Sequence, residues 1–168
     1  MIQDRTGVDV RMEVEHNKIH EGVTYYTGEI KQSISAGGNL YYGLVTGDKE
    51  IHIRPSSIVT SGDKVTYQTF KGSAFHGGSA LTVLNRNQVD PQPNTASWVK
   101  APTVDTEGTV FAEAYLPGST GIGGTRSGSS LGAGEEYILP PNSKFLMKFT
   151  NESSAANLIS WSITWYEE

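Results

Sequence analysis

The sequence predicts an all-β fold, a β-sandwich of jelly-roll type with a long Gly-rich loop. Short segments in which apolar and polar residues alternate recur along the chain and are separated by turn signals, as in a sandwich or barrel. No stretch keeps the 3.6-residue period of an amphipathic helix over ~11 residues. Glycine is also frequent, at 19 of 168 residues, and only 18% of residues are charged, which is typical of a domain with many turns.

The first third of the chain predicts two strands and a hairpin. Alternation over residues 8–15 predicts a strand, and the β-branched and aromatic residues 23–27 predict another. Residues 39–46 and 50–54 flank a Gly-Asp-Lys turn and predict a hairpin. We expect Pro55 to end its second strand, because proline cannot donate to a sheet ladder.

The rest of the chain predicts further strands at 64–70, 80–84, 95–100, 109–116 and 137–139. Residues 90–94 contain two prolines and predict a loop that crosses the fold. The strongest alternation is at the C-terminus, in residues 145–149 and 159–165. Trp161 and Trp165 share one face of the last strand with two isoleucines, so we expect both in the core.

Glycine is concentrated in residues 117–134, where seven of 18 residues are Gly. This segment cannot bury enough apolar area to form a strand or helix alone, so it predicts a long exposed loop. The chain has the length of one domain. We therefore expect a polar N-terminal arm over residues 1–7 and a single sandwich domain over residues 8–168.

Composition excludes several classes of function. Cysteine is absent, which excludes disulfides, thiolate metal sites and a thiol nucleophile. Thirteen basic residues against 18 acidic ones give a net charge of -5, so we expect no nucleic-acid partner. No apolar run approaches the ~18 residues of a membrane span. The first ten residues have no apolar signal-peptide region, so we expect a soluble protein made in the cytoplasm.

Candidate cofactor and metal motifs are incomplete. The run from Gly121 to Gly124 has Arg126 where a dinucleotide-binding motif needs its third glycine. His16 and His20 have the spacing of two metal ligands on a helix, but Asn17 replaces the glutamate of zinc proteases. In a strand they would share a face but lie about 13 Å apart, too far to share one metal. We therefore expect neither a cofactor nor a metal.

Catalytic motifs are also missing. No serine lies in a Gly-x-Ser-x-Gly elbow. The glutamate pairs 135/136 and 167/168 are adjacent in sequence, so in a strand each pair would point to opposite faces. We expect them to be solvated ends rather than a catalytic pair, and we expect no enzymatic activity.

Aromatic and arginine side chains are the candidates for contacts. Tyr25/Tyr26 and Tyr41/Tyr42 are adjacent pairs, so one member of each should point outward. Trp98 beside the Pro-rich loop is a further candidate for exposure, and exposed aromatics serve in protein interfaces or stack on sugars. Arginine makes several hydrogen bonds at once, so Arg54, Arg86 and Arg126 could pair across subunits or equally within one.

Several motifs in order resemble those of small virion proteins of tailed bacteriophages, of the capsid decoration or cement type. They are residues 51–55 (IHIRP), 85–87 (NRN), 116–123 (LPGSTGIG), 145–151 (FLMKFTN), 156–157 (AN) and 165–167 (WYE). The resemblance covers roughly residues 10–168 and implies an all-β protein without catalytic residues. It further implies a place on the capsid exterior, binding to the major capsid protein, and synthesis in the bacterial host cytoplasm.

We expect a symmetric homo-oligomer, a dimer or trimer, that bridges neighbouring capsid subunits through its arm and Gly-rich loop. The candidate capsid or inter-subunit contacts are Arg5, Arg54, Arg86, Trp98, Pro117, Gly118, Gly121, Gly123 and Arg126. The alternative is a carbohydrate-binding or adsorption module of a head or tail fibre, with Tyr41, Tyr42 or Trp98 as the stacking surface. A hydrolase on the same fold would need a cluster of acids or histidines that the sequence does not display.

Overall fold

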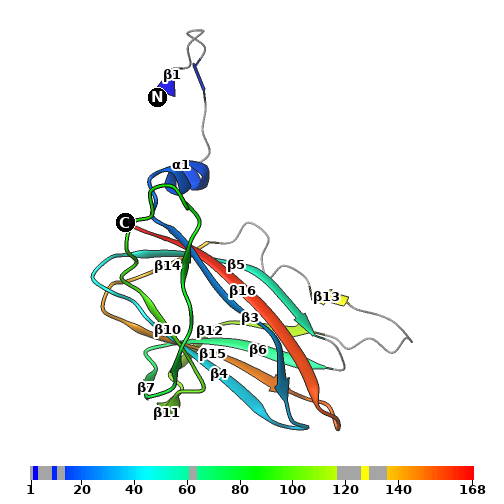
Figure 1. The fold of residues 1–168 in the computed structure, drawn as a ribbon. Helices are drawn as coiled ribbons and strands as arrows, with labels where there is room; N and C mark the ends of the chain where they lie inside the picture. The colour runs from blue at the N-terminus through cyan, green and yellow to red at the C-terminus, as the bar shows by residue number, and fades with distance from the viewer. Residues whose placement is uncertain (1, 4–8, 11–13, 61–63, 117–125, 129–135) are drawn as a thin grey trace.

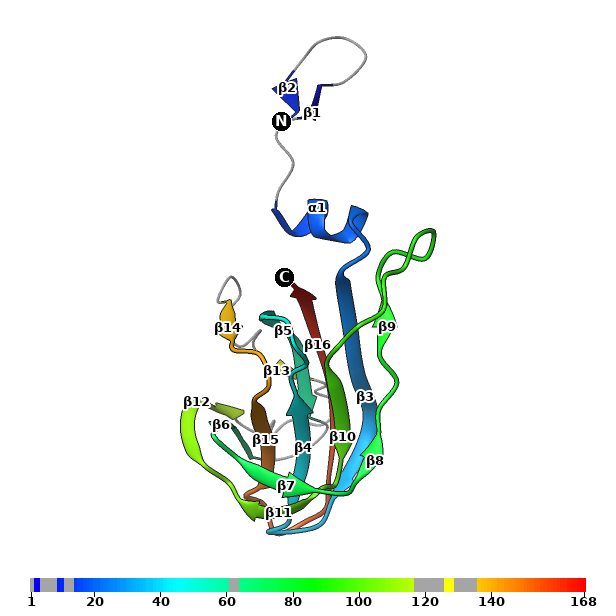
Figure 2. The same cartoon turned by 90° about the vertical axis from the view of Figure 1, so that its left-hand side faces the viewer.

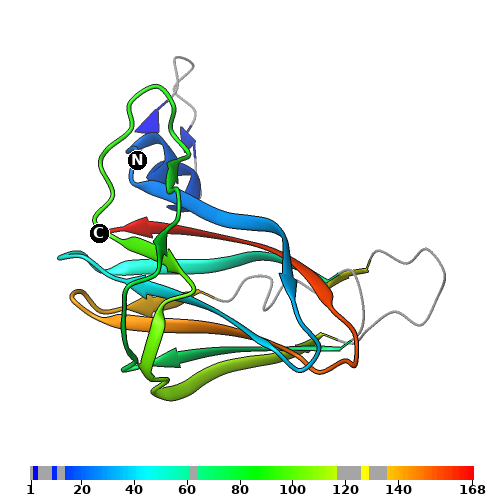
Figure 3. The same cartoon turned by 60° about the horizontal axis from the view of Figure 1, so that its bottom comes forward.

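A computed structural model describes residues 2–3, 9–10, 14–60, 64–116, 126–128 and 136–168. Within these ranges the predicted all-β sandwich is confirmed: two six-stranded sheets pack face to face (Figures 1 and 3). Neighbouring strands in both sheets are antiparallel. None of the described helices is long and apolar enough to cross a membrane.

We call the first sheet the β16 sheet. Its strand order is β13-β5-β16-β3-β9, and β14 also pairs with β5. The strands are β3 (Thr24–Ile34), β5 (Ile51–Thr60), β9 (Leu84–Asn85), β13 (Arg126–Gly128), β14 (Tyr137–Leu139) and β16 (Asn157–Glu167).

We call the second sheet the β15 sheet, with strand order β12-β6-β15-β4-β10-β8. Its strands are β4 (Asn39–Val45), β6 (Val65–Lys71), β8 (Ser79–Ala80), β10 (Ser97–Lys100), β12 (Thr109–Leu116) and β15 (Lys144–Asn151). Two small sheets pair β7 (Ala74–His76) with β11 (Thr103–Thr106), and β1 (Ile2–Gln3) with β2 (Asp9–Val10).

The chain alternates between the two sheets from β3 to β6, so the hairpin expected from residues 39–46 and 50–54 is wrong. β4 pairs with β10 and β15, whereas β5 pairs with β16. The connection between them is a corner whose hydrogen bonds go to another segment. The Thr46 hydroxyl donates to the carbonyl of Pro140 at 2.9 Å, and Asn142 N–H donates to the carbonyl of Gly47 at 2.7 Å. A turn signal alone does not say which sheet the next strand joins.

Pro55 does not end its strand as expected; β5 continues to Thr60. The register against β16 shifts between Ser162 and Ile163, which pair with Ser57 and Pro55. One extra residue of β5 lies between those two partners. Proline is tolerated in a sheet at such a bulge, where the ladder of hydrogen bonds is already interrupted.

The strand expected over residues 8–15 is also wrong. Among the described residues of this range Asp9–Val10 is a strand, whereas Val14 and Glu15 belong to α1, which begins at Val14 and ends at His20. Glu15 in its first turn and Lys18 and His20 in its last turn complement the helix dipole. The alternation is misleading at Val14, which is 62% exposed rather than part of the core. Figure 2 shows α1 at the end of the sandwich near the C-terminus, with β1 and β2 beyond it.

The main core lies between the two sheets. Trp161 and Trp165 are 2% and 1% exposed, which confirms their predicted place. Trp98 packs against both, with ring centroids 5.6 and 6.2 Å away, and is only 3% exposed. The expectation that Trp98 is an exposed aromatic is therefore wrong. The loop before it leads inward, because β10 is an inner strand of its sheet.

A second, smaller core covers the outer face of the β15 sheet. Phe70, Leu146 and Phe75 of β7 form it. Gly43 of β4 lies directly beneath Phe75, where a Cβ would approach two ring atoms to 2.5 Å. The absence of a side chain at Gly43 therefore lets the β7–β11 pair close over the sheet.

The Gly-rich segment 117–134 contains β13, whose three residues pair with residues 58–60 of β5. The remaining residues of the expected loop lie outside the described residues. Of the expected polar arm over residues 1–7, only Ile2–Gln3 is described, and these two residues form β1.

Candidate functional site

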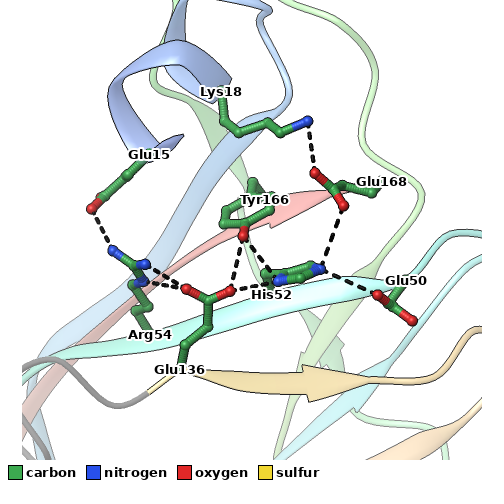
Figure 4. A network of polar contacts seen from close by, with 8 residues as sticks. All are labelled: Glu15, Lys18, Glu50, His52, Arg54, Glu136, Tyr166 and Glu168. Carbon is green, nitrogen blue, oxygen red and sulfur yellow. Dashed lines mark hydrogen bonds and ion pairs between the residues drawn. The ribbon is translucent and has the colours of Figure 1, made fainter. Parts of the chain in front are cut away.

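Eight polar residues form a connected network at the end of the β16 sheet, where the C-terminus and α1 meet (Figure 4). We call it the α1 cluster. It joins segments that are far apart in sequence: α1, β5, the residue before β14, and the end of β16. Its members are Glu15, Lys18, Glu50, His52, Arg54, Glu136, Tyr166 and Glu168.

Strand alternation and register bring the centre of the cluster together. Ile51 and Ile53 of β5 are buried in the core, so His52 and Arg54 point to the opposite face. His52 is the cross-strand partner of Tyr166 on β16. Their rings stack with centroids 4.4 Å apart and an interplanar angle of 14°. The pairing of two sheet neighbours thus fixes the orientation of the imidazole.

Glu136 is the acceptor at the centre. Its Oε1 lies 2.5 Å from His52 Nδ1 and accepts a hydrogen bond of 2.8 Å from the Tyr166 hydroxyl. Its Oε2 accepts two hydrogen bonds from Arg54, one from Nε at 2.8 Å and one from Nη2. Burial alone would raise the pKa of Glu136, but hydrogen bonds from His52, Arg54 and Tyr166 outweigh it and lower the pKa to about 2. Glu136 is therefore a carboxylate throughout the neutral and mildly acidic range.

The pKa of Tyr166 is shifted in the opposite direction, upward. Burial first, and the adjacent Glu136 carboxylate second, raise the pKa of Tyr166 to about 12. The phenol therefore stays protonated and donates to Glu136. This group has no capacity to act as a base at ordinary pH.

Two contacts tie α1 to this centre. Arg54 Nη1 donates to Glu15 at 2.8 Å, and the hydrogen bond to Glu136 is the main cause of a raised Arg54 pKa. Lys18 contacts Glu168 at 2.7 Å, which raises the pKa of Lys18 and lowers that of Glu168. Both ends of the short helix are therefore held by ion pairs to the sandwich.

The second nitrogen of His52 also faces carboxylates. Nε2 lies 3.2 Å from Glu50 and 3.7 Å from Glu168. A protonated imidazole has two N–H donors, so it can donate to carboxylates on both sides. Both nitrogens of this histidine therefore have a carboxylate partner within the chain.

The contacts of the α1 cluster are therefore structural: they attach α1 to the sandwich. It contains no serine, threonine or cysteine to act as a nucleophile. Its single tyrosine and histidine are engaged by carboxylates. Among the described residues no group of three or more His, Asp or Glu is arranged to hold a metal ion. What remains is a set of charge-assisted hydrogen bonds between four segments.

A cavity of about 160 Å³ lies between the sheets. Its lining is largely apolar and aromatic and includes Trp98, Phe111, Tyr137 and Phe145. Glu113 is the one acidic residue in that lining, whereas acid–base hydrolysis of a glycoside needs two carboxyl groups. Among the described lining residues, the cavity therefore presents one carboxyl group.

The structure places the arginine candidates in contacts within the chain. Arg54 pairs with Glu136 and Glu15, and Arg86 pairs with Glu15 at 3.1 Å. The sequence left open whether these arginines pair across subunits or within one. These contacts of Arg54 and Arg86 lie within one chain. The backbone of Arg126 belongs to β13. Arg5, Pro117, Gly118, Gly121 and Gly123 lie outside the described residues.

In one of the two tyrosine pairs, one side chain is buried and the other is exposed, as expected. Tyr25 is 1% exposed and Tyr26 is 41% exposed, so one faces inward and one outward. Tyr42 is fully buried, and Tyr41 is half-buried with its hydroxyl on Glu107 at 2.7 Å. With Trp98 also buried, two of the three residues expected to stack on a sugar are in the core.

Sequence reasoning missed the acidic members of these contacts. The expectation that the adjacent glutamates are solvated ends is wrong for Glu136 and for Glu167, which is 2% exposed. Alternation did carry one usable signal, because it places His52 and Arg54 on the same face of a strand.

No model of a known protein family matches this chain, and no curated protein sequence matches it.

Proposed function

We propose that this chain is a structural protein of a tailed-phage virion, a decoration protein that binds the outer shell and bridges major capsid subunits. The strand order supports the jelly-roll part of the expectation. One sheet contains the run β3-β16-β5-β14 and the other β4-β15-β6-β12, and the chain alternates between the sheets from β3 to β6 and again from β14 to β16. Double-sheet jelly rolls recur in viral capsid domains, so this strand order supports the proposed role.

The observation that carries the proposal is the attachment of α1. Arg54–Glu15 and Lys18–Glu168 hold both ends of the helix on the sandwich. The chain that precedes α1 therefore leaves the body from a fixed point, and β1 and β2 lie beyond α1 (Figure 2). A protein that clamps a neighbour needs such an anchored terminal segment, because a fixed origin lowers the entropy lost on binding.

The outer face of the β16 sheet is a second candidate contact surface. Tyr26, Ile30 and Leu158 lie there and are 41%, 77% and 38% exposed. Between them lie the small residues Gly28 and Ser162, which pair across β3 and β16. This partly apolar part of the face lies beside the charged α1 cluster and fits a protein partner, either a capsid subunit or another copy in a dimer or trimer.

The carbohydrate-binding alternative loses its main support. Stacking needs an accessible aromatic face, and Trp98 and Tyr42 are buried in the core. We therefore do not advance it as a second function.

The direct test is biochemical and structural on the particle. Virions of the phage that encodes this chain are expected to contain it in many copies on the outer shell, located by reconstruction. Particles that lack it should release DNA at lower temperature than complete ones. If the chain is missing from purified virions, or if its removal leaves heat resistance unchanged, the decoration role is wrong.

A second experiment tests the N-terminal segment. Deletion of residues 1–13 leaves α1 and the α1 cluster intact, so the sandwich should keep its thermal stability. Binding of the shortened protein to capsids that lack it should fall at least tenfold. The matched control is Val89→Ser, which changes a side chain that is 96% exposed and lies outside both candidate contact surfaces, and it should bind like the full chain. If the deletion binds like the full chain, the contact lies elsewhere on the protein.

A further inference from the structure

Two histidines on the exposed side of α1 face each other. The Nε2 atoms of His16 and His20 lie 3.0 Å apart, at the distance of a hydrogen bond between the two imidazoles, and their ring centroids lie 4.7 Å apart. Both side chains are exposed, and neither belongs to the α1 cluster. The α1 cluster therefore does not account for this pair.

We propose that His16 and His20 form a two-imidazole binding site for a divalent late transition metal ion of the Zn²⁺, Ni²⁺ and Cu²⁺ class. The inference does not rest on the proposed function. Imidazole nitrogen binds such ions at about 2.0–2.1 Å. Two nitrogens in neighbouring positions of one ion, at 90–110° to each other, then lie about 2.9–3.3 Å apart. The observed separation of 3.0 Å falls in this range.

The helix supplies the spacing. Residues at i and i+4 share one face of a helix, and helical zinc sites use two histidines at this interval. A strand would separate the two rings by about 13 Å. The site therefore exists because residues 14–20 are helical, which the alternation of the sequence did not predict.

The helix that carries the pair is held in place. Lys18, between the two histidines, contacts Glu168 at 2.7 Å and Glu21 at 3.1 Å. The carbonyl of His20 accepts a hydrogen bond of 3.1 Å from the Asn87 side chain. These contacts fix the backbone on which both ligands stand, so less ordering is needed when an ion binds.

The ligand set fixes the expected selectivity. No third His, Asp or Glu of the described chain completes a larger group, so water fills the remaining positions. Two nitrogen ligands favour Cu²⁺ over Ni²⁺ and Zn²⁺, following the usual order of affinities. Mg²⁺ and Ca²⁺ require oxygen ligands and should not bind here. Protons compete for the same nitrogens, so affinity should fall as pH is lowered through the histidine range.

The test is calorimetric titration of the untagged full chain with CuCl₂, NiCl₂, ZnCl₂ and MgCl₂. The chain has four histidines and no cysteine, so few other strong ligands compete. One ion per chain is expected for the first three salts. His16→Ala and His20→Ala should each weaken Ni²⁺ binding at least tenfold, and alanine keeps the helix because its helix propensity is high.

The matched control is His76→Ala. His76 is a single exposed histidine on β7 and contacts Asp105 at 3.1 Å. This variant should bind Ni²⁺ like the unmodified chain. Equal losses from His16→Ala, His20→Ala and His76→Ala would mean adventitious binding and overturn the proposal. So would unchanged binding in the first two variants, or a ratio of one ion to two chains. Circular dichroism and Cu²⁺ electron paramagnetic resonance add independent readouts, the helix content and the number of bound nitrogens.

Discussion

Arg54 of β5 donates a hydrogen bond of 2.8 Å to Glu15 of α1, across 39 residues of sequence. The same guanidinium donates through Nε to Glu136 at 2.8 Å. One planar side chain with several fixed donors thus joins the helix, a central strand and the segment that enters β14. No other residue type could make both contacts in this geometry, because lysine offers a single nitrogen.

Replacing Arg54 should loosen α1 more than the sandwich. The guanidinium is 39% exposed, so we expect Arg54→Ala to cost only about 1 kcal/mol of global stability. Amide hydrogen exchange in residues 14–20 should nevertheless become clearly faster. Arg86→Ala is the control, because Arg86 reaches Glu15 alone, at 3.1 Å, and should change both quantities less. Unchanged exchange in α1 would mean that other contacts hold the helix.

Gly43→Ala should dislodge the small outer core. The new Cβ would stand 2.5 Å from two ring atoms of Phe75 and 3.0 Å from Val99, so the ring must move. Overpacking of this kind costs about 1–3 kcal/mol. Urea unfolding measures the loss, and the β7–β11 pair should show the largest chemical-shift changes.

A double-mutant cycle separates this clash from other effects of the new methyl group. In a Phe75→Ala background the obstructing ring is gone, so Gly43→Ala should cost much less than it does alone. If both backgrounds show the same cost, the strain lies in the β4 backbone rather than against Phe75.

Local alternation was sufficient for the strands but not for their partners. It predicted the core positions of Trp161 and Trp165, because period-two patterns report which face is buried. The turn signal after Thr46 predicts a hairpin, although the structure has a corner there. The sequence of a turn is similar whether the chain stays in one sheet or crosses to another. Trp98 was expected outside because its neighbouring loop is polar, although its own strand is internal.

The candidate site was less predictable than the fold. His52 and Arg54 were visible on one strand face, but Glu15, Glu136 and Glu168 come from segments that only tertiary structure brings together. The i, i+4 spacing of His16 and His20 was visible as well. Its meaning depended on residues 14–20 forming a helix, and a seven-residue helix with no buried side chain leaves a weak hydrophobic signal.

Stability should fall with acid through Glu136. Its pKa is lowered from 4.5 to about 2 in the folded protein, so folding favours the carboxylate. The resulting stabilisation is complete above the unfolded value near 4.5 and is lost as pH falls from there through about 2. Glu136→Gln should therefore make the free energy of unfolding less dependent on pH across this interval. Urea unfolding at several pH values measures the slope.

Glu113→Gln is the matched control for this slope. Glu113 is exposed on β12 and accepts one hydrogen bond, at 3.3 Å, from Gln68. It should leave the pH dependence as it is in the unmodified chain. An equal flattening by both substitutions would show that general charge reduction, and not the Glu136 contacts, governs acid stability.

Glu167 and Glu168 are neighbours in sequence with opposite environments, which gives the sharpest comparison. Glu167 is 2% exposed and accepts backbone N–H groups of Thr95 at 2.9 Å and Ala96 at 3.1 Å. In Glu167→Gln an amide NH₂ replaces one acceptor oxygen, so a donor faces a donor inside the protein. We expect a loss of about 1–3 kcal/mol, measured by urea unfolding.

Glu168→Gln removes a partly exposed ion pair with Lys18 and should cost less than about 1 kcal/mol. The two variants change net charge equally, so the difference between them reports burial and hydrogen bonding. Faster amide exchange at Thr95 and Ala96 should accompany Glu167→Gln only. Equal losses in stability would mean that the Glu167 carboxylate does not hold the segment that leads into β10, and that the loop is fixed by Tyr25, whose hydroxyl donates to the carbonyl of Pro93 at 3.1 Å.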